Sequence, residues 1–211
     1  MDHGPDCNRR RRRLLQGGAA LLGFVSLDSL AVAIEAQPPA AVEPVPARPL
    51  AGLLAERRSL WLQRGDEELR ATWWTAARGQ DRDEYLKLCW LLRDVQANRV
   101  MPIDRDLLDL LAGIQAWLGN GGQRLPMRVH SGYRSARTNH KTEGAALNSK
   151  HVLGKAADIS IPGVSNVTLA GISRVLGVGG TGFYVGRGFV HVDTGSERLW
   201  IDAGKRGAKP L

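Results

Sequence analysis

Two short segments of the chain combine imidazole and carboxylate side chains in a pattern that suits metal chemistry. The first runs from Ser149 to Asp158 and holds His151 and Asp158 seven positions apart. The second, further along the chain, reads Val-His191-Val-Asp193. Two neutral imidazoles and one carboxylate form a common catalytic zinc set, in which a water takes the fourth position. Such a water becomes a nucleophile near neutral pH, so the pattern indicates a hydrolytic site.

The segments that carry these side chains are predicted to be β-strands. Asp158 leads into Ile-Ser-Ile161, whose alternation of apolar and polar residues is typical of a strand. A carboxylate in such a place is costly to bury unless another group pairs with it. Residues 182–193 predict a hairpin with a glycine-containing turn. In its second strand His191 and Asp193 project from the same face, because alternate residues of a strand share a face.

The rest of the chain predicts helices and a few further strands. Apolar residues recur at helical spacing in two segments, and Asp104 stands where an N-terminal cap of the second is needed. Cys89 falls on the apolar face of the first, which predicts a buried structural thiol rather than a nucleophile. The expected elements are a hairpin over 58–74, helices over 83–97 and 105–118, a strand over 127–131, and a helix capped by Asn166 that runs to Leu176. Together they predict an α+β domain in which helices pack on a small antiparallel sheet.

The two segments form part of a longer pattern that resembles a known group of peptidases. Ser-x-His-x-x-Gly-x-Ala-x-Asp, the later His-x-Asp and the preceding Ser131-Gly-Tyr-Arg134-Ser135 are similar to motifs of the LAS group. This group contains zinc D-Ala-D-Ala carboxypeptidases, VanX-like peptidases and murein endopeptidases. The similarity is closer to the MepK-like branch of murein endopeptidases and covers roughly residues 57–202. It implies a Hedgehog/DD-peptidase-like fold.

The resemblance also implies the roles of individual residues. One Zn²⁺ per chain would be bound by His151, Asp158 and His191, which match the zinc ligands of the group. Arg134 matches an arginine that lies near the substrate carbonyl or carboxylate, where it would act in catalysis and in substrate binding.

Two further residues are expected to help bind the substrate. Tyr133 directly precedes Arg134, and Ser149 stands before the first ligand, where the group also has serine.

The general base is the point at which the chain departs from many members of the group. Those members have a Glu three residues before the last histidine ligand, or a His two residues before it. Here these positions hold Gly188 and Phe189, which cannot take a proton. Asp193 is the first candidate, and it would either accept the water proton or orient a ligand. His130 and His140 are lesser candidates.

The N-terminal segment has the features of an export signal. Five arginines, Arg9 to Arg13, precede an apolar stretch over 17–34, and Ala-Val-Ala at 31–33 offers a cleavage site. This pattern is typical of twin-arginine signals, which direct folded proteins to the periplasm or beyond. The expected parts are a signal peptide over 1–33, a Pro/Ala-rich linker over 34–56, a zinc peptidase domain over 57–204 and a tail over 205–211. No stable membrane insertion is expected after cleavage.

The charge of the chain agrees with a negatively charged polymer as partner. The formal net charge is +8, and it is +6 without residues 1–33, which hold five arginines and three aspartates. Such a charge would suit nucleic acid equally well, but no nucleic-acid-binding motif accompanies it, so no nucleic acid is expected as a partner. The resemblance to murein endopeptidases implies peptidoglycan peptides as partners. The sequence therefore predicts a monomeric, zinc-dependent murein endopeptidase that cuts stem or cross-link peptides. A D,D-carboxypeptidase and a non-catalytic peptidoglycan-binding module on the same fold stay open as alternatives.

Overall fold

The computed structural model describes residues 49–122, 125–142, 144–146 and 148–202. All of them belong to one compact unit, Glu43–Leu211. The predicted signal peptide, most of the predicted linker and the tail lie outside the described residues. No helix in the described part of the chain is long and apolar enough to cross a membrane.

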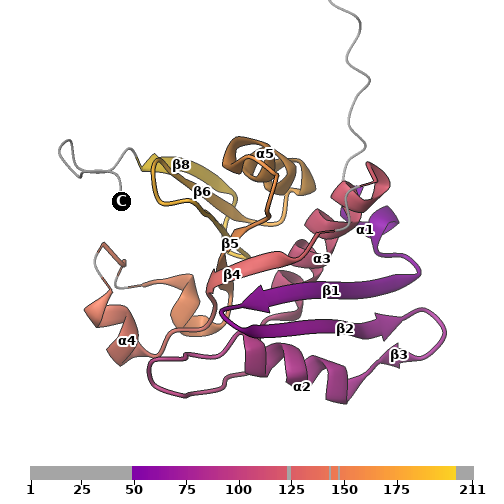
Figure 1. Ribbon diagram of the computed structural model, residues 1–211, viewed down its shortest axis with the longest axis horizontal. Helices are drawn as coiled ribbons and strands as arrows, with labels where there is room; N and C mark the ends of the chain where they lie inside the picture. The colour runs from indigo at the N-terminus through magenta and orange to yellow at the C-terminus, as the bar shows by residue number, and fades with distance from the viewer. Residues whose placement is uncertain (1–48, 123–124, 143, 147, 203–211) are drawn as a thin grey trace, which may run out of the picture. The chain divides into compact units, whose positions relative to one another are not determined.

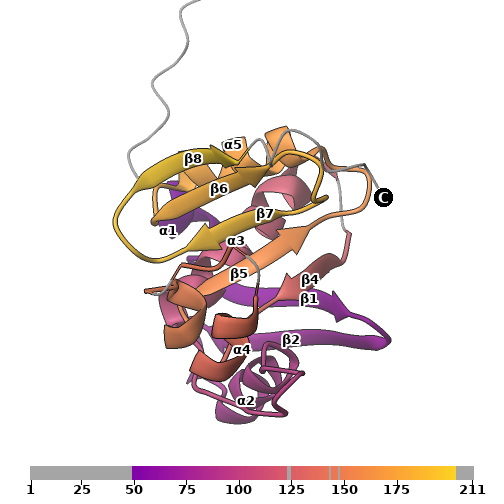
Figure 2. The same ribbon diagram turned by 90° about the vertical axis from the view of Figure 1, so that its left-hand side faces the viewer.

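In the described part of the chain, eight strands form one mixed sheet in the order β3-β2-β1-β4-β5-β7-β6-β8. Figure 2 shows this order from β2 to β8. Neighbouring strands are antiparallel except for the pairs β1–β4 and β6–β8. The predicted combination of helices with a small antiparallel sheet is confirmed in part: the sheet is mostly antiparallel but contains two parallel pairs, and it is larger than expected because the N-terminal hairpin extends it. The strands are β1 Arg57–Arg64, β2 Glu67–Thr75, β3 Gly79–Gln80, β4 Met127–Ser131, β5 Ala156–Ser160, β6 Gly180–Tyr184, β7 Val190–Asp193 and β8 Arg198–Asp202.

The helices begin at polar caps, and the sequence predicts some of these caps correctly. Asp104 accepts a hydrogen bond from the backbone N–H of Asp106 and caps α3, as expected. The cap of α5 is Ser165 rather than the predicted Asn166, because its hydroxyl accepts from the backbone N–H of Thr168. The helices are α1 Pro49–Leu53, α2 Arg82–Leu91, α3 Arg105–Asn120, α4 Ala136–Lys141, α5 Asn166–Leu176 and the 3-10 helix η1 Lys150–Leu153.

Helix α2 is shorter than the predicted helix over 83–97. The chain leaves the helix after Leu91 and makes a tight loop in which the backbone of Asp94 pairs with that of Arg99. The Asp94 carboxylate accepts a hydrogen bond from the backbone N–H of Ala97, and Asn98 takes a positive φ of 46°. Aspartate and asparagine favour such local bonds over helix continuation. The loop places Asp94 beside the region that precedes α4.

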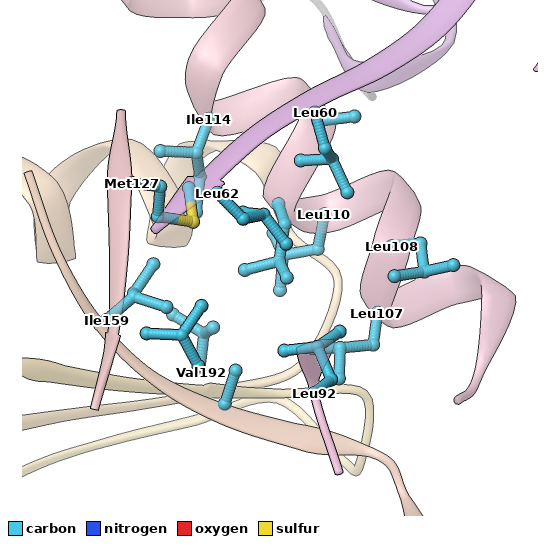
Figure 3. Packing of buried hydrophobic residues seen from close by; sticks show 14 of the residues in the cluster. Leu60, Leu62, Leu92, Leu107, Leu108, Leu110, Ile114, Met127, Ile159 and Val192 are labelled. Atoms are coloured by element: carbon cyan, nitrogen blue, oxygen red, sulfur yellow. The ribbon is translucent and has the colours of Figure 1, made fainter. Parts of the chain in front are cut away.

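The hydrophobic core lies between α3 and the sheet (Figures 1 and 3). The apolar face of α3 packs against residues from β1, β4, β5 and β7, which Figure 3 shows pointing toward it. Cys89 of α2 is also buried, at 1% exposure, so the predicted structural thiol is confirmed. The fully buried members labelled in Figure 3 include Leu62, Leu107, Leu110, Ile114, Met127 and Ile159.

The strands β5 and β7 separate this core from a polar face. Ile159 of β5 and Val192 of β7 point into the core (Figure 3). Because alternate residues of a strand face opposite ways, Asp158, His191 and Asp193 lie on the other side of the sheet. Asp158 and His191 are direct partners in the antiparallel ladder. The core therefore fixes the strands that carry the polar side chains.

Candidate metal centre

Three side chains from η1, β5 and β7 converge on one point beside the sheet. His151 Nε2 lies 3.2 Å from Asp158 Oδ1 and 3.2 Å from His191 Nδ1, and His191 Nδ1 lies 3.0 Å from Asp158 Oδ1. All three residues are buried, at 1%, 7% and 7% exposure. They form the one group of histidine, cysteine and acidic residues with metal-binding proximity among the described residues. We call them the His-Asp-His cluster.

The position of His151 is set by the ends of η1. The Ser149 hydroxyl accepts a hydrogen bond from the backbone N–H of His151 and caps the helix. Gly154 ends it in the left-handed conformation, with a φ of 65°, and a Cβ there would lie 2.9 Å from the Pro102 carbonyl oxygen. Glycine is therefore required at 154. Ser149, which the sequence predicts to bind the substrate, lines the cleft, but its hydroxyl is engaged by the backbone N–H of His151.

The tautomer of His151 follows from a backbone contact. Its Nδ1 lies 2.7 Å from the carbonyl oxygen of Gly132. A carbonyl oxygen only accepts, so Nδ1 carries the proton and donates it. The lone pair of the neutral ring is then on Nε2, the atom that faces Asp158 and His191. Gly132 is tightly enclosed, since a Cβ would lie 2.4 Å from the Leu92 carbonyl oxygen.

The tautomer of His191 is set by Asp193 in the same way. His191 Nε2 lies 2.9 Å from Asp193 Oδ2, and the carboxylate accepts its proton. The lone pair of the neutral ring is thus on Nδ1, inside the cluster. Asp193 lies on the outer side of the ring and is fully buried, at 0% exposure. Of the two roles that the sequence leaves open for Asp193, this position favours the orientation of a ligand.

Asp193 is surrounded by donors. Arg198 forms a two-pronged contact with it, at 2.6 Å to Oδ2 and 3.2 Å to Oδ1. The backbone N–H groups of Gly195 and Gly180 donate to Oδ1, at 2.8 and 3.3 Å. Burial raises the pKa of Asp193, but His191 and Arg198 outweigh it and hold the pKa below its usual range. The carboxylate therefore stays ionised, and hydrogen-bond donors already engage both of its oxygen atoms. It is thus poorly suited to take a proton from water.

Trp200 encloses the cluster from β8. Its ring centroid lies 5.2 Å from that of His191, and the Arg198 guanidinium lies 4.9 Å above the Trp200 ring. A Cβ at Gly182 would lie 2.4 Å from this ring, so only glycine leaves room for it. Neither Arg198 nor Trp200 is among the site residues predicted from the sequence. The alternation of Arg-Leu-Trp-Ile-Asp over 198–202 was the available signal, because it puts Arg198 and Trp200 on one strand face.

The pKa values within the cluster differ between its members. Burial raises the pKa of Asp158, but the adjacent imidazoles outweigh it and hold the pKa well below its usual range. Burial dominates at His151 and lowers the pKa of this imidazole. At His191 burial acts in the same direction, but Asp158 and Asp193 outweigh it and raise the pKa. The cluster thus combines an ionised carboxylate with a strongly desolvated, neutral imidazole.

The donor atoms fit a zinc ion. Three lone pairs that face one another at 3.0 to 3.2 Å repel unless a cation lies between them. Ligands that bind zinc tetrahedrally at about 2.0 to 2.1 Å lie roughly 3.3 Å apart, close to these separations. Two imidazoles and a carboxylate are also ligands that zinc prefers. Each imidazole donates the N–H of its other ring nitrogen to an oxygen acceptor, as zinc-binding histidines almost always do.

The cluster lies in a cleft of about 850 Å³. Tyr133 and Arg134, which the sequence predicts to bind the substrate, both line it. Arg134 is half-buried, and its Nε is buried without a hydrogen-bond partner among the described residues. Burial lowers the pKa of this guanidinium, although nearby Asp158 and Tyr184 act to raise it. A desolvated cation without an acidic partner suits the binding of an oxygen with negative charge.

The two remaining histidines that the sequence singles out lie in different places. His130 lines the cleft from β4, where a register shift between Val129 and Ser131 interrupts the pairing with β5. Its Nε2 lies 2.8 Å from the Ser160 hydroxyl. His140 is exposed on α4 and is not among the described residues that line the cleft. The structure thus brings His130 into the site and leaves His140 outside it.

Comparisons with known proteins identify the family. The model of the family described as peptidoglycan L,D-endopeptidase MepK matches residues 54–200, which include the whole cluster. MepK of Escherichia coli K12, a peptidoglycan L,D-endopeptidase, is 40% identical over 129 residues, 58% of this chain and 68% of that protein. The probable peptidoglycan L,D-endopeptidase MepK of Haemophilus influenzae is 39% identical over 118 residues, 54% of this chain and 62% of that protein. The resemblance to the MepK-like branch is thereby confirmed, and the chain belongs to the peptidoglycan L,D-endopeptidase MepK family.

Proposed function

We propose that this chain is a zinc-dependent peptidoglycan endopeptidase of the L,D type, built on a Hedgehog/DD-peptidase-like domain. The observation that carries the proposal is the convergence of three lone-pair atoms, from His151, Asp158 and His191, at the floor of a cleft. Family membership supplies the substrate, because the relatives are named as peptidoglycan L,D-endopeptidases. It also favours an endopeptidase over the D,D-carboxypeptidase and the non-catalytic module.

The cluster would hold one zinc ion through His151 Nε2, Asp158 Oδ1 and His191 Nδ1. Bound there, zinc would lower the pKa of a water and polarise the scissile carbonyl. The chain itself would supply the orientation of the ligands. The Gly132 carbonyl holds His151 in the tautomer that presents Nε2, and Asp193 holds His191 in the tautomer that presents Nδ1.

Arg134 would stabilise the negative charge that develops on the carbonyl oxygen during peptide hydrolysis. Its guanidinium is partly desolvated and makes no ion pair among the described residues, so its donors are available to a substrate. Electrostatic stabilisation of this kind is strongest in a site that excludes water. Tyr133 would form part of the adjacent cleft wall.

The remaining expectations concern the chain outside the site. Residues 57–204 would be the catalytic domain, exported to the periplasm or beyond by a twin-arginine signal over 1–33 and followed by a tail over 205–211. Residues 34–56 would link the two parts. The protein would act as a monomer on peptidoglycan peptides, without nucleic acid and without membrane insertion after signal cleavage.

Digestion of purified sacculi tests the proposed activity. The protein is incubated with cross-linked sacculi, with and without a chelator, and the released muropeptides are identified by mass spectrometry. We expect products cut at a bond between an L-centre carbonyl and a D-centre amine, and we expect the chelator to abolish them. Release of terminal D-Ala alone would support a D,D-carboxypeptidase, and retention on sacculi without products would support a binding module.

Metal analysis of two histidine variants tests the zinc site. The wild type should contain about one zinc per chain, and His151→Ala should contain little, because the variant loses one of three protein ligands. His140→Ala is the matched control, since His140 is exposed outside the cleft, and it should retain the metal. Equal zinc in all three proteins would refute the ligand assignment.

A further inference from the structure

Among the described residues that line the cleft, the basic side chains outnumber the acidic ones, which are Asp94, Asp158 and Asp202. Arg198 is paired with Asp193, and Arg64 donates to the backbone carbonyls of Leu91 and Arg93. The other basic side chains of the cleft have no ion pair among the described residues. The basic residues that line the cleft are Arg64, Arg134, Lys150, Arg187 and Arg198.

Arg187 is held over the cleft by the turn between β6 and β7. Gly186 and Gly188 flank it and both take positive φ values, of 83° and 72°. The backbone N–H of Arg187 donates to the carbonyl of Tyr184 and closes the turn. The two left-handed positions require glycine, so the turn is shaped to present the one long side chain between them.

Tyr184 joins Arg187 to the interior of the cleft. The Arg187 guanidinium lies 5.6 Å from the centroid of the Tyr184 ring, within the range of a cation–π contact. Arg134 and Tyr184 line the same cleft as the cluster. Phe189 closes the wall behind Tyr184, with the ring centroids 5.3 Å apart.

We propose that Arg187 and Tyr184 form a subsite that binds a free carboxylate of the substrate peptide beside the scissile bond, in the cleft that Arg134 also lines. This inference rests on the proposed peptidase function and adds Arg187 and Tyr184 as residues that determine specificity. The Arg187 guanidinium can offer a pair of parallel N–H donors to a carboxylate, and the Tyr184 phenol can add an O–H donor. Arg134 would keep its proposed role at the scissile carbonyl oxygen.

The chemistry of the subsite predicts discrimination between a carboxylate and a carboxamide. Both groups have the same shape, but the carboxamide lacks the negative charge and points an N–H₂ group at cationic donors. Charge-assisted hydrogen bonds contribute about 1.5 to 3 kcal/mol each, so loss of one corresponds to roughly a tenfold or larger change. The structure therefore predicts that amidation of the peptide at this position protects it from cleavage.

Two matched substrates test the subsite. One is a cross-linked muropeptide with the free carboxylate beside the scissile bond, and the other is the same peptide with a carboxamide there. For the zinc-loaded wild type we expect kcat/KM to be roughly tenfold higher on the carboxylate. Arg187→Met should remove most of this preference through a higher KM on the carboxylate, with little change on the carboxamide. Arg82→Met is the control, because Arg82 is exposed on α2 outside the cleft and its loss changes the net charge equally.

The outcomes separate this inference from the proposed function. If the wild type cuts both peptides equally, or Arg187→Met slows both equally, the subsite is refuted while the peptidase function stands. If the wild type cuts neither peptide, the proposed function fails. The subsite is then tested by equilibrium binding of the two peptides, and equal affinity of the wild type for both would overturn it. Zinc content and thermal unfolding of Arg187→Met establish that the exposed substitution leaves the fold intact.

Discussion

Asp193 contacts His191 on the side of the imidazole that faces away from the cluster. Asp193 Oδ2 lies 2.9 Å from Nε2, while Nδ1 of the same ring lies 3.0 Å from Asp158. The imidazole therefore stands between the carboxylate and the proposed metal position. Asp193 can act on the proposed metal only through His191. Loss of a general base and loss of an orienting group would therefore have different measurable effects.

The first prediction concerns Asp193→Asn. An amide offers one acceptor oxygen to donors that converge from His191, Arg198 and the backbone, so its N–H₂ group would face other donors. We expect zinc affinity to fall roughly 10- to 100-fold, the usual scale for an outer partner of a metal ligand. Affinity is measured by competition with a metal-binding dye. Excess zinc should restore much of the rate on cross-linked muropeptides.

The opposite result would identify Asp193 as the base. Loss of a general base typically costs a hundredfold or more, roughly 10² to 10⁴, in rate. A variant that binds zinc as tightly as the wild type, yet stays this slow at saturating zinc, would contradict the orienting role. A role for Asp193 as the base would also require the His191 ring to move, because the carboxylate is fully buried behind this ring.

The second prediction extends the same relationship to Arg198. This arginine holds both oxygens of Asp193 and lies over the Trp200 ring. Arg198→Met should weaken zinc binding by about tenfold, because Asp193 would then hold His191 less rigidly. Arg198→Lys should give an intermediate value, since a point charge cannot reproduce the two-pronged contact.

Arg187→Met is the matched control for this measurement. Arg187 lines the same cleft but contacts Tyr184 rather than the cluster. It should therefore keep the zinc affinity of the wild type. Equal losses in the Arg187 and Arg198 variants would show that the general charge of the cleft, rather than the Arg198–Asp193 contact, controls the metal.

The sequence predicted the parts of the fold that depend on local patterns. The alternation around His191 and Asp193 placed both side chains on one strand face, and their 2.9 Å contact agrees with this. The cap at Asp104 was confirmed because it needs only a nearby backbone N–H. Strand periodicity does not say which ring nitrogen of His191 faces the cluster. Which nitrogen faces the cluster depends on the position of β5 beside β7, which the structure provides.

The features that the sequence missed depend on long-range contacts. Strand β8 pairs in parallel with β6, and neither the pairing partner nor the direction is encoded in residues 198–202 alone. Arg198 and Trp200 reach the site through this pairing. The predicted small sheet likewise omitted the N-terminal hairpin, which joins the sheet through the parallel contact of β1 with β4. Local propensity does not specify such pairings, because they join segments that are distant in the sequence.

The third prediction concerns export, for which the relevant residues lie outside the described part of the chain. Twin-arginine receptors read guanidinium geometry, which lysine does not reproduce. Replacing all of Arg9 to Arg13 by Lys should therefore retain the precursor in the cytoplasm, as measured by cell fractionation and immunoblotting. The whole run is changed because neighbouring arginines could supply a shifted pair. Normal export of the five-lysine variant would favour the general secretory pathway instead.

Asp94 connects the loop after α2 to the start of α4. Its carboxylate accepts hydrogen bonds from the backbone N–H groups of Ala97, at 3.0 Å, and Ser135, at 2.8 Å. Ser135 in turn caps α4 and directly follows Arg134. Burial raises the pKa of Asp94, but the bonds from Thr138, Ser135 and the backbone outweigh it and lower the pKa to about 2. Asp94 is thus an ionised anchor for the segment that carries Arg134.

The last prediction is that Asp94→Asn destabilises the fold in a pH-dependent way. The pKa is about 2 in the folded protein and about 3.9 in an unfolded chain, so the ionised carboxylate stabilises the fold above pH 4 and this contribution is lost as the pH falls toward 2. We expect the variant to lose about 1 to 3 kcal/mol of unfolding free energy at pH 7, and the difference from the wild type to shrink between pH 4 and pH 2. Urea unfolding with a chelator present measures this without the pH dependence of metal binding. Asp66→Asn, in the exposed turn between β1 and β2, should match the wild type throughout. A difference that stays constant from pH 7 to pH 2.5 would mean that the charge of Asp94 is not the source of its contribution.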